Sequence, residues 1–259
     1  MSPSWRNRLY ITIEQQRIRL LKLGRGLKPK QIASYEEDIP HGGKQRYSQV
    51  VSDRLTQLLA QQAWQNVEVS VVLSNSLVRY AAISFPVQLQ NYAEQEAFAR
   101  HSLIQIHGTT AETWVLRLQR GKAGSPWLVS AIEQTLLDGL RKACAINQRK
   151  LVSVVPYLMP VFNLHRKMIK NKPAWLVINE PEYSLFALLN EGGFIAFNGV
   201  YHHDVHEIPL LLDRENLACL LPEPCRVVYL CTTTHNDLSV LFKMNTPYEF
   251  NMLNVVSPT

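Results

Sequence analysis

Short apolar runs of strand length, separated by polar turns, fill the first part of the chain. Residues 9–13 and 18–23 carry such runs, and a third strand is expected at 31–39, after the breakers Gly24, Gly26 and Pro29. In residues 47–64 the apolar positions recur every third or fourth residue, which predicts an amphipathic helix. The continuous apolar run at residues 67–73 predicts a buried strand. The expected order is therefore β-β-β-α-β.

The same order of elements returns in the last third of the chain. Residues 175–178, 185–189 and 194–197 predict three strands, and a helix is expected to begin near Pro209, because proline suits a first helical position. Residues 227–231 predict the closing strand. Two copies of one unit indicate a repeated architecture, which does not require the two copies to share residues.

A segment with its own elements lies between the two copies. The pattern predicts, in order, a strand at 77–85, a helix at 89–107, strands at 113–118 and 127–132, a helix ending near 147 and a strand at 151–155. Residues 156–173 contain three prolines and several basic residues, which predicts a hinge or linker into the second copy.

These elements predict a division of the chain into three parts. Residues 1–76 form the first unit, which residues of about 150–172 complete. Residues 77–149 form an inserted subdomain, and residues 173–259 form the second unit.

Several short stretches carry a resemblance to a known family. They are Val-Val-Leu-Ser-Asn at 71–75, Val-Arg-Tyr-Ala at 78–81, Ala-Arg-His at 99–101 and Trp-Val-Leu-Arg-Leu at 114–118, with Pro86, Gly108, Val155 and Pro156. In these stretches and in its order of elements the chain resembles the actin-like, ribonuclease-H-type superfamily. Within that superfamily it is most similar to the type IV pilus assembly protein PilM and to the cytoplasmic part of type II secretion protein L. The resemblance covers most of the chain by element order and much less by residue identity.

The resemblance implies both a fold and a role. The fold is α/β (α+β), with duplicated ribonuclease-H-like β-β-β-α-β units, an inserted α/β subdomain and no complete ATPase cleft. The role is that of a cytoplasmic scaffold, peripheral at the inner membrane, which binds the cytoplasmic tail of an inner-membrane assembly protein. A motor ATPase and a second copy of the chain are further partners that it suggests.

The strand-turn-strand loops argue against a nucleotide cofactor. Phosphate binding by such a hairpin needs close backbone N–H groups, which favour glycine, and an acid that holds magnesium. Residues 14–17 (Glu-Gln-Gln-Arg) contain no glycine, where PilM-like proteins keep an Asp-x-Gly turn, and only Glu14 could replace the metal-linked acid. Residues 179–183 present Pro181 and two carboxylates, and residues 232–235 lack the expected glycine pair. We therefore expect no cofactor.

Other chemistry has little support in the sequence. Glu14 and Asp53 could belong to a two-metal nuclease site, but no acid follows the strand at 67–73. The potential metal ligands in residues 202–207 (His-His-Asp-Val-His-Glu) are expected to form a polar loop, and the four cysteines, which lack CxxC spacing, to be reduced core thiols. No nucleophile elbow or P-loop occurs. We predict no catalytic residue and no metal site.

The net charge of +6 is confined to the N-terminal end. Residues 1–50 hold ten Lys or Arg and four Asp or Glu, whereas the remaining residues hold seventeen of each. The excess includes eight residues that could form a basic face: Arg6, Arg8, Arg17, Arg19, Lys22, Arg25, Lys28 and Lys30. Without an Arg/aromatic motif this face is expected to be solvated and not to bind nucleic acid. Arg17 and Arg19 point to the same face of their strand, so they could contact one partner together. With Lys22 they are the predicted contacts to an acidic partner segment or an anionic membrane surface.

The sequence thus predicts a non-enzymatic scaffold of a pilus or secretion assembly platform. It is expected to bind protein partners through a groove of the subdomain, with an extended partner tail along a sheet edge or in a cleft. The alternative is an ATP-handling actin-like protein, which requires Glu14 to replace the usual aspartate and the turn to tolerate Gln15 and Gln16. A third hypothesis is nucleic-acid binding through the basic N-terminal face, which would show a steep salt dependence. No apolar run is long enough to span a bilayer and no apolar signal core is present, which agrees with the expected cytoplasmic location.

Overall fold

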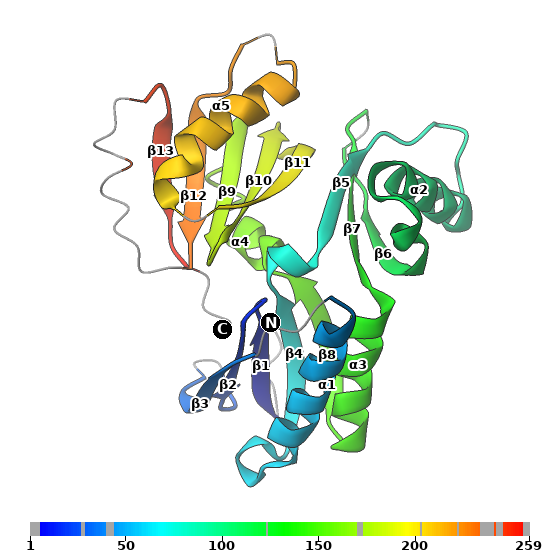
Figure 1. Ribbon diagram of the computed structural model, residues 1–259, viewed down its shortest axis with the longest axis vertical. Coiled ribbons are helices and arrows are strands. Elements are labelled where there is room, and N and C mark those ends of the chain that lie inside the picture. The colour runs from blue at the N-terminus through cyan, green and yellow to red at the C-terminus, as the bar shows by residue number, and fades with distance from the viewer. Residues whose placement is uncertain are drawn as a thin grey trace.

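A computed structural model describes most of the chain: residues 6–26, 29–39, 44–122, 124–169, 173–202, 204–221, 223–233, 241 and 246–255, with the side chains of residues 44–46 left out. Its strands form two five-stranded sheets and one three-stranded sheet, which the helices cover (Figure 1). Among the described residues no helix is both long and apolar enough to cross a membrane.

The first sheet has the strand order β3-β2-β1-β4-β8. β1 pairs antiparallel with β2, β2 pairs antiparallel with β3, and β4 lies parallel to both β1 and β8. The strands are β1 (Asn7–Ile13), β2 (Arg17–Leu23), β3 (Gln31–Asp38), β4 (Val67–Leu73) and β8 (Lys150–Pro156). On β1 the alternate apolar side chains Leu9, Ile11 and Ile13 are fully buried, whereas the outer strand β3 is mostly exposed. This alternation places one face of the sheet in a hydrophobic core.

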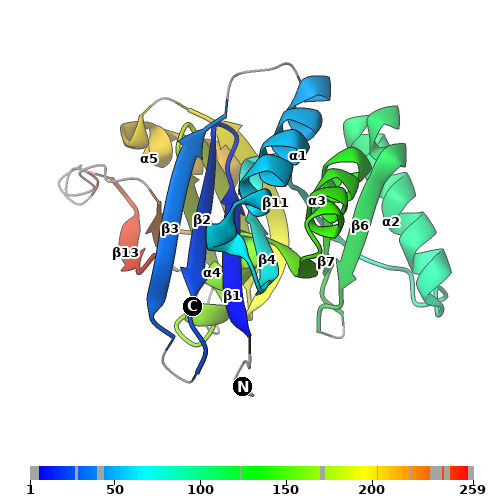
Figure 2. The ribbon, with the colours of Figure 1, turned by 90° about the horizontal axis from the view of Figure 1, so that it is seen from below.

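Two helices cover that face of the first sheet. They are α1 (Lys44–Ala60) and α3 (Gln134–Ile146), which lie side by side in Figures 1 and 2. At their crossing the Ser52 hydroxyl donates to the carbonyl oxygen of Gly139 at 3.2 Å. A β-carbon added at Gly139 would lie 3.0 Å from the β-carbon of Ser52, so the close approach of the two helices depends on this glycine.

The second sheet repeats the order and the strand directions of the first. Its order is β11-β10-β9-β12-β13. β10 pairs antiparallel with both β9 and β11, and β12 lies parallel to both β9 and β13. The strands are β9 (Ala174–Glu180), β10 (Tyr183–Asn190), β11 (Gly193–Tyr201), β12 (Val227–Thr232) and β13 (Glu249–Leu253). All seven residues of β9 are buried, so this strand is covered on both faces.

Two helices provide that cover. On one face α5 (Ile208–Ala218) packs against Trp175, Val177 and Phe186. On the other face α4 (Leu158–His165) packs against Leu176, Ile178 and Leu185.

The position of α4 corrects the prediction of a linker at residues 156–173. Leu158 and Val161 are fully buried in the core of the second sheet, and Ile169 is also buried there. The prediction failed because it read the prolines as breakers. Pro160 lies in the first turn of α4, where a residue without an N–H loses no helical hydrogen bond. Residues 170–172 are outside the described part of the chain.

The third sheet has the order β5-β7-β6. Its strands come from the part of the sequence between β4 of the first large sheet and β9 of the second. Its strands are β5 (Arg79–Ile83), β6 (Trp114–Gln119) and β7 (Trp127–Glu133), and α2 (Tyr92–His107) packs on it. β5 lies beside β11 of the second sheet, where the rings of Tyr80 and Phe197 stack at 5.4 Å (Figure 1). The three-stranded sheet therefore contacts the second large sheet.

The mixed α/β fold class agrees with the sequence prediction. Each strand predicted between residues 9 and 231 overlaps an observed strand, and the helices predicted at 47–64 and 89–107 overlap α1 and α2. β13 was not predicted. The division into units at residues 1–76, 77–149 and 173–259 stays a prediction.

Candidate functional site

The two large sheets meet where several strands end, and a cavity of about 370 Å³ lies at this junction. It is lined by the β1–β2 turn at Glu14 to Arg17, by Asp38 and Ile39, by Ser74 and Ser76 after β4, and by the β9–β10 turn at Glu180 to Glu182. Both hairpin turns that the sequence singled out therefore face the same space.

Asn75 organises this junction. Its side chain is fully buried, and its Oδ1 accepts hydrogen bonds from the Tyr80 hydroxyl at 2.6 Å and from the backbone N–H of Leu158 at 3.0 Å. Its own backbone N–H donates to Oε2 of Glu180 at 3.0 Å. One residue thus joins β4, β5, the start of α4 and the second hairpin.

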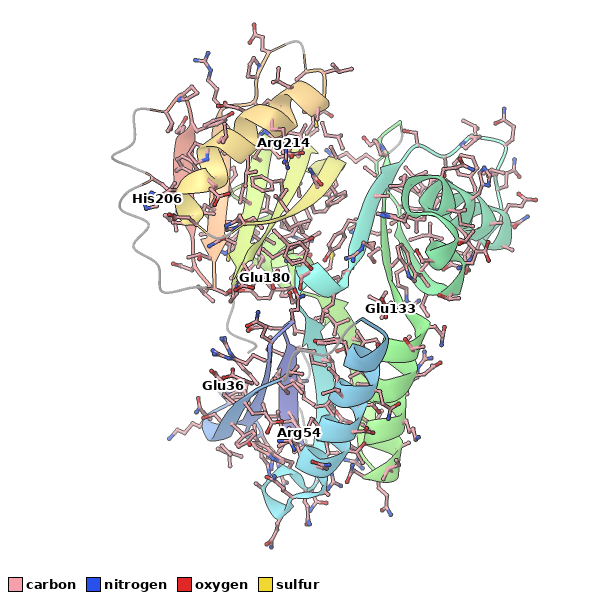
Figure 3. All side chains as sticks on the ribbon, in the orientation of Figure 1. Glu36, Arg54, Glu133, Glu180, His206 and Arg214 are labelled. Carbon is pink, nitrogen blue, oxygen red and sulfur yellow. The ribbon has the colours of Figure 1, made fainter. Side chains whose placement is uncertain are left out.

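The carboxyl group of Glu180 is the most perturbed acid of the site. Only 4% of the residue is exposed, and this burial raises its pKa to about 7. The hydrogen bonds from Asn75 and Ser74 act in the opposite direction, and the nearby charge of Glu14 adds to the rise. Figure 3 shows Glu180 between the two large sheets.

Glu14, the one candidate cofactor residue, does lie in the cavity. Its side chain is mostly buried, and burial raises its pKa, while the charges of Arg19 and Arg17 oppose this effect. The Tyr47 hydroxyl fixes the turn by donating to the carbonyl oxygen of Glu14 at 2.7 Å. Asp53, the other predicted nuclease residue, is on the exposed side of α1 and does not line the cavity.

The residues of the cavity do not fit a magnesium-bound nucleotide. Nε2 of Gln16 donates to Oε2 of Glu182 at 3.0 Å, so the two turns between which phosphate would lie are bonded to each other. A phosphate there would also meet the carboxylates of Glu14, Glu180 and Glu182, and Pro181 offers it no N–H group. Within the described residues, no three His, Cys, Asp or Glu side chains come close enough to hold a metal ion.

The predicted partner-binding residues have intramolecular contacts. Arg17 lies 2.7 Å from Glu36 and 2.9 Å from Asp38, and Arg19 lies 3.1 Å from Glu36. The ammonium group of Lys22 donates to the carbonyl oxygen of Ala63 at 2.6 Å. Figure 3 shows Glu36 on the outer strand β3. Their contact with a partner stays a prediction.

The potential ligands at residues 202–207 are separated. His202 is buried and bonded to the hydroxyl of Ser184 at 2.8 Å, whereas His206 is exposed beside Asp204. Asp204 caps the 3₁₀ turn η4 (Val205–Glu207) by accepting from the backbone N–H of His206. His203, Thr234, His235 and Lys28 lie outside the described residues. Of the cysteines, Cys144, Cys225 and Cys231 are buried and Cys219 is half-buried, and none is in a disulfide.

A second and larger hollow, which we call the subdomain groove, lies between the first sheet and the three-stranded sheet. It has a volume of about 670 Å³. Consecutive residues of two edge strands line it, residues 114–117 of β6 and residues 151–156 of β8, together with parts of α2, α3 and β7. The backbones of two sheet edges therefore border one groove.

Two side chains in the subdomain groove face away from the protein interior. Val152 is 52% exposed, because a bulge places it between Leu151 and Ser153, which pair with consecutive residues of β4. Arg117 of β6 is exposed and has no ion-pair partner among the described residues, unlike Arg100, which lies 3.3 Å from Glu96. The sequence predicts that partners bind through a groove of the subdomain, but it does not predict which residues line that groove. An arginine in an alternating strand was the only local sign of it.

No protein-family model and no curated protein sequence matches the chain. Solved structures do match its fold. The PilM–PilN type IV pilus biogenesis complex matches with a TM-score of 0.71 and 14% identity, over 95% of this chain and 88% of the other. The cytoplasmic domain of EpsL, an inner-membrane component of the type II secretion system of Vibrio cholerae, matches with a TM-score of 0.58 and 11% identity, over 95% and 90%.

A third structure names the fold. It is a protein of unknown function from Bacteroides thetaiotaomicron with an actin-like ATPase fold, which matches with a TM-score of 0.61 and 10% identity, over 95% of this chain and 90% of the other. The chain therefore has an actin-like fold, which it shares with structures from a pilus complex and a secretion system.

Proposed function

We propose that this protein is a non-enzymatic scaffold of a type IV pilus or type II secretion-like assembly platform. It would act at the cytoplasmic side of the inner membrane by binding the cytoplasmic tail of an inner-membrane assembly protein. The observation that carries the proposal is the subdomain groove, which two sheet edges border. The shared fold with a structure of a PilM–PilN complex supports the class of partner.

The groove suits an extended segment. An edge strand offers unpaired N–H and C=O groups, and a peptide can add to it as a further strand, while pockets select its side chains. The edge of β8 is interrupted by the bulge at Val152 and ends at Pro156, whereas the pairing of β6 with β7 has no irregularity. We therefore assign the main-chain pairing to β6, and the contact with apolar side chains to Val152 and its neighbours on β8.

Charge would select the segment. Arg100 is held by Glu96 and by the carbonyl oxygens of Glu112 and Trp114, and Arg141 lies 3.2 Å from Asp138. Arg117 is exposed in the groove and has no ion-pair partner among the described residues, so its charge is available to a ligand. The tail should therefore carry an Asp or Glu opposite Arg117, next to apolar residues that cover Val152.

The test begins with a photo-crosslinking amino acid at position 152 in the native cell. The captured membrane protein is identified, its cytoplasmic tail is synthesised, and binding of the peptide is measured by calorimetry. Arg117→Glu is expected to weaken binding at least tenfold, and Arg226→Glu, an exposed arginine at the start of the second sheet's β12, to leave it unchanged. Equal binding by the wild type and Arg117→Glu would remove the groove as the docking site.

Two other elements of the hypothesis concern further contacts. The basic hairpin with Arg17, Arg19 and Lys22 would form a second contact to an acidic partner segment or an anionic membrane surface. A motor ATPase and a second copy of the chain would be additional partners of the scaffold. ATP binding is the alternative function, and the carboxylates at the hairpin junction weigh against it.

A further inference from the structure

The outward face of α5 carries large apolar side chains that the described part of the monomer does not cover. Leu210 is 72% exposed and Leu217 is 76% exposed, one on each side of the exposed pair Asp213 and Arg214. These positions are three, four and seven residues apart, so they share one face of the helix. Figure 1 shows α5 on the face of the second sheet, and Figure 3 shows Arg214 on it.

The end of α5 adds a strained and exposed leucine. Leu220 is 88% exposed and has a φ of 48°, in the left-handed region. This position after a helix usually holds glycine, because a side chain there is strained. Nothing in the described monomer explains why this leucine is both exposed and strained. A partner that covers the side chain would remove the cost of its exposure.

A hollow lies beside this end of the helix. It has a volume of about 440 Å³ and is lined by Leu217, Leu220, Leu221, Asp213 and Tyr248 among others. This is more than enough room for one large apolar side chain. The face of α5 therefore offers a projecting Leu210 near its first turn and an apolar hollow at its last.

We infer that α5 is a self-docking surface, on which a second copy of this chain pairs its own α5 antiparallel across a two-fold axis between Asp213 and Arg214. In a two-fold interface each contact occurs twice, with the roles of the copies exchanged. Residues at equal distances from the axis then face each other. Leu210 of each copy meets Leu217 and enters the hollow of the other copy, and each Asp213 meets the other copy's Arg214.

The charges of the two central residues allow this exchange. Within the described residues Asp213 accepts one hydrogen bond, through Oδ1 from the Tyr248 hydroxyl at 2.6 Å, so Oδ2 is available to the other copy. Arg214 uses Nε and Nη2 toward Glu215, at 3.1 and 2.8 Å, and its Nη1 remains for a further acceptor. When α5 is paired antiparallel with itself, leucine meets leucine and Asp213 meets Arg214. An unrelated partner would not require this symmetry, so the arrangement favours a second copy.

Sedimentation of the whole chain from low to several hundred micromolar concentration tests the inference. The wild type is expected to form dimers, and Leu210→Ser or Leu217→Ser to weaken dimerisation at least tenfold. Val87→Ser is the matched control, since Val87 is 90% exposed on another surface. A monomer throughout, or a dimer that neither leucine variant weakens, would overturn the inference.

The two-fold geometry makes a sharper demand on the charges. Asp213→Arg alone places two arginines against two arginines, and Arg214→Asp alone places two aspartates against two aspartates, so each variant should dimerise poorly. An equal mixture of the two should form a heterodimer, because every arginine then faces an aspartate. Tyr248→Phe shows what loss of the tyrosine contact does alone. If the mixture dimerises no better than either variant alone, Asp213 does not pair with Arg214 of the other copy.

This interface and the subdomain groove are separate surfaces. Arg117→Glu should dimerise like the wild type, and Leu217→Ser should bind the tail peptide like the wild type. Failure of the dimer therefore leaves the tail-binding proposal standing, and the reverse also holds.

Discussion

The backbone N–H of Asn75 donates to the carboxyl group of Glu180, 3.0 Å away and 105 residues later in the chain. The contact joins the end of a strand in the first sheet to a hairpin turn in the second. It places an acid in a buried position that the hairpin sequence alone does not explain.

The buried acid makes stability depend on pH. Burial raises the pKa of Glu180 from 4.5 to about 7, so between these values the folded state keeps a proton that the unfolded state has released. Stability from this group is therefore present below pH 4.5 and is lost as the pH rises to 7. Glu180→Gln removes the ionisation and is expected to be more stable than the wild type at pH 8, by on the order of 2 kcal/mol.

Urea denaturation at pH 5 and pH 8 measures this difference. The gain should shrink at pH 5, where the wild-type carboxyl is protonated in the folded state. Glu182→Gln, an exposed change in the same turn, is the control and should not reproduce the gain in stability at pH 8. A Glu180→Gln protein that is less stable at both pH values would contradict the assignment.

Magnesium-ATP is expected to leave the melting temperature unchanged. A ligand at a hundred times its dissociation constant would add about 2.7 kcal/mol of stability, which a thermal shift assay detects readily. The hydrogen bond between Gln16 and Glu182 and the carboxylates beside it oppose phosphate binding. A concentration-dependent rise in the melting temperature with magnesium-ATP, absent with magnesium alone, would revive the alternative function.

Truncation within α4 should destabilise the protein. Leu158 is fully buried, and Leu158→Ala is expected to cost about 2–4 kcal/mol through lost apolar contacts and the cavity left behind. Leu164→Ala on the same helix removes the same atoms from a side chain that is 59% exposed and should cost little. Equal midpoints for the two variants in urea denaturation would mean that the segment behaves as the linker first predicted.

Reversing charge on the first hairpin tests its predicted contact. Arg17 and Arg19 are each 37% exposed in their ion pairs, and such surface pairs contribute about 0–1 kcal/mol, so partner carboxylates could replace them at small cost. Arg17→Glu with Arg19→Glu is expected to weaken binding of the partner's whole cytoplasmic region at least fivefold, but not of the short tail peptide. If binding of the whole region is unchanged, the hairpin is not part of the interface.

Sequence reasoning located most strands because each depends on a local apolar run. β13 escaped it, since Glu249–Leu253 carries only a short mixed pattern and owes its place to pairing with β12. The two hairpin turns were recognised as facing a potential site, and both line one cavity. The contact of the second turn with Asn75 was beyond prediction, because it arises only when segments far apart in the chain are brought together.

The subdomain groove shows the same limit. Its walls come from β6 and β8, on which Arg117 and Val152 are the exposed side chains that line it. Which edge of a sheet stays unpaired depends on the topology of the whole chain. The local pattern can indicate a strand, but it cannot say which neighbour that strand lacks.

The bond between Gln16 and Glu182 has a consequence for how the protein could respond to the cell. In a protein whose two halves close on bound ATP, closure depends on the ATP supply, and the halves separate after hydrolysis. Here the two hairpin turns are joined by a hydrogen bond between side chains of the chain itself. Because this contact needs no bound nucleotide, it would not change with the supply of ATP.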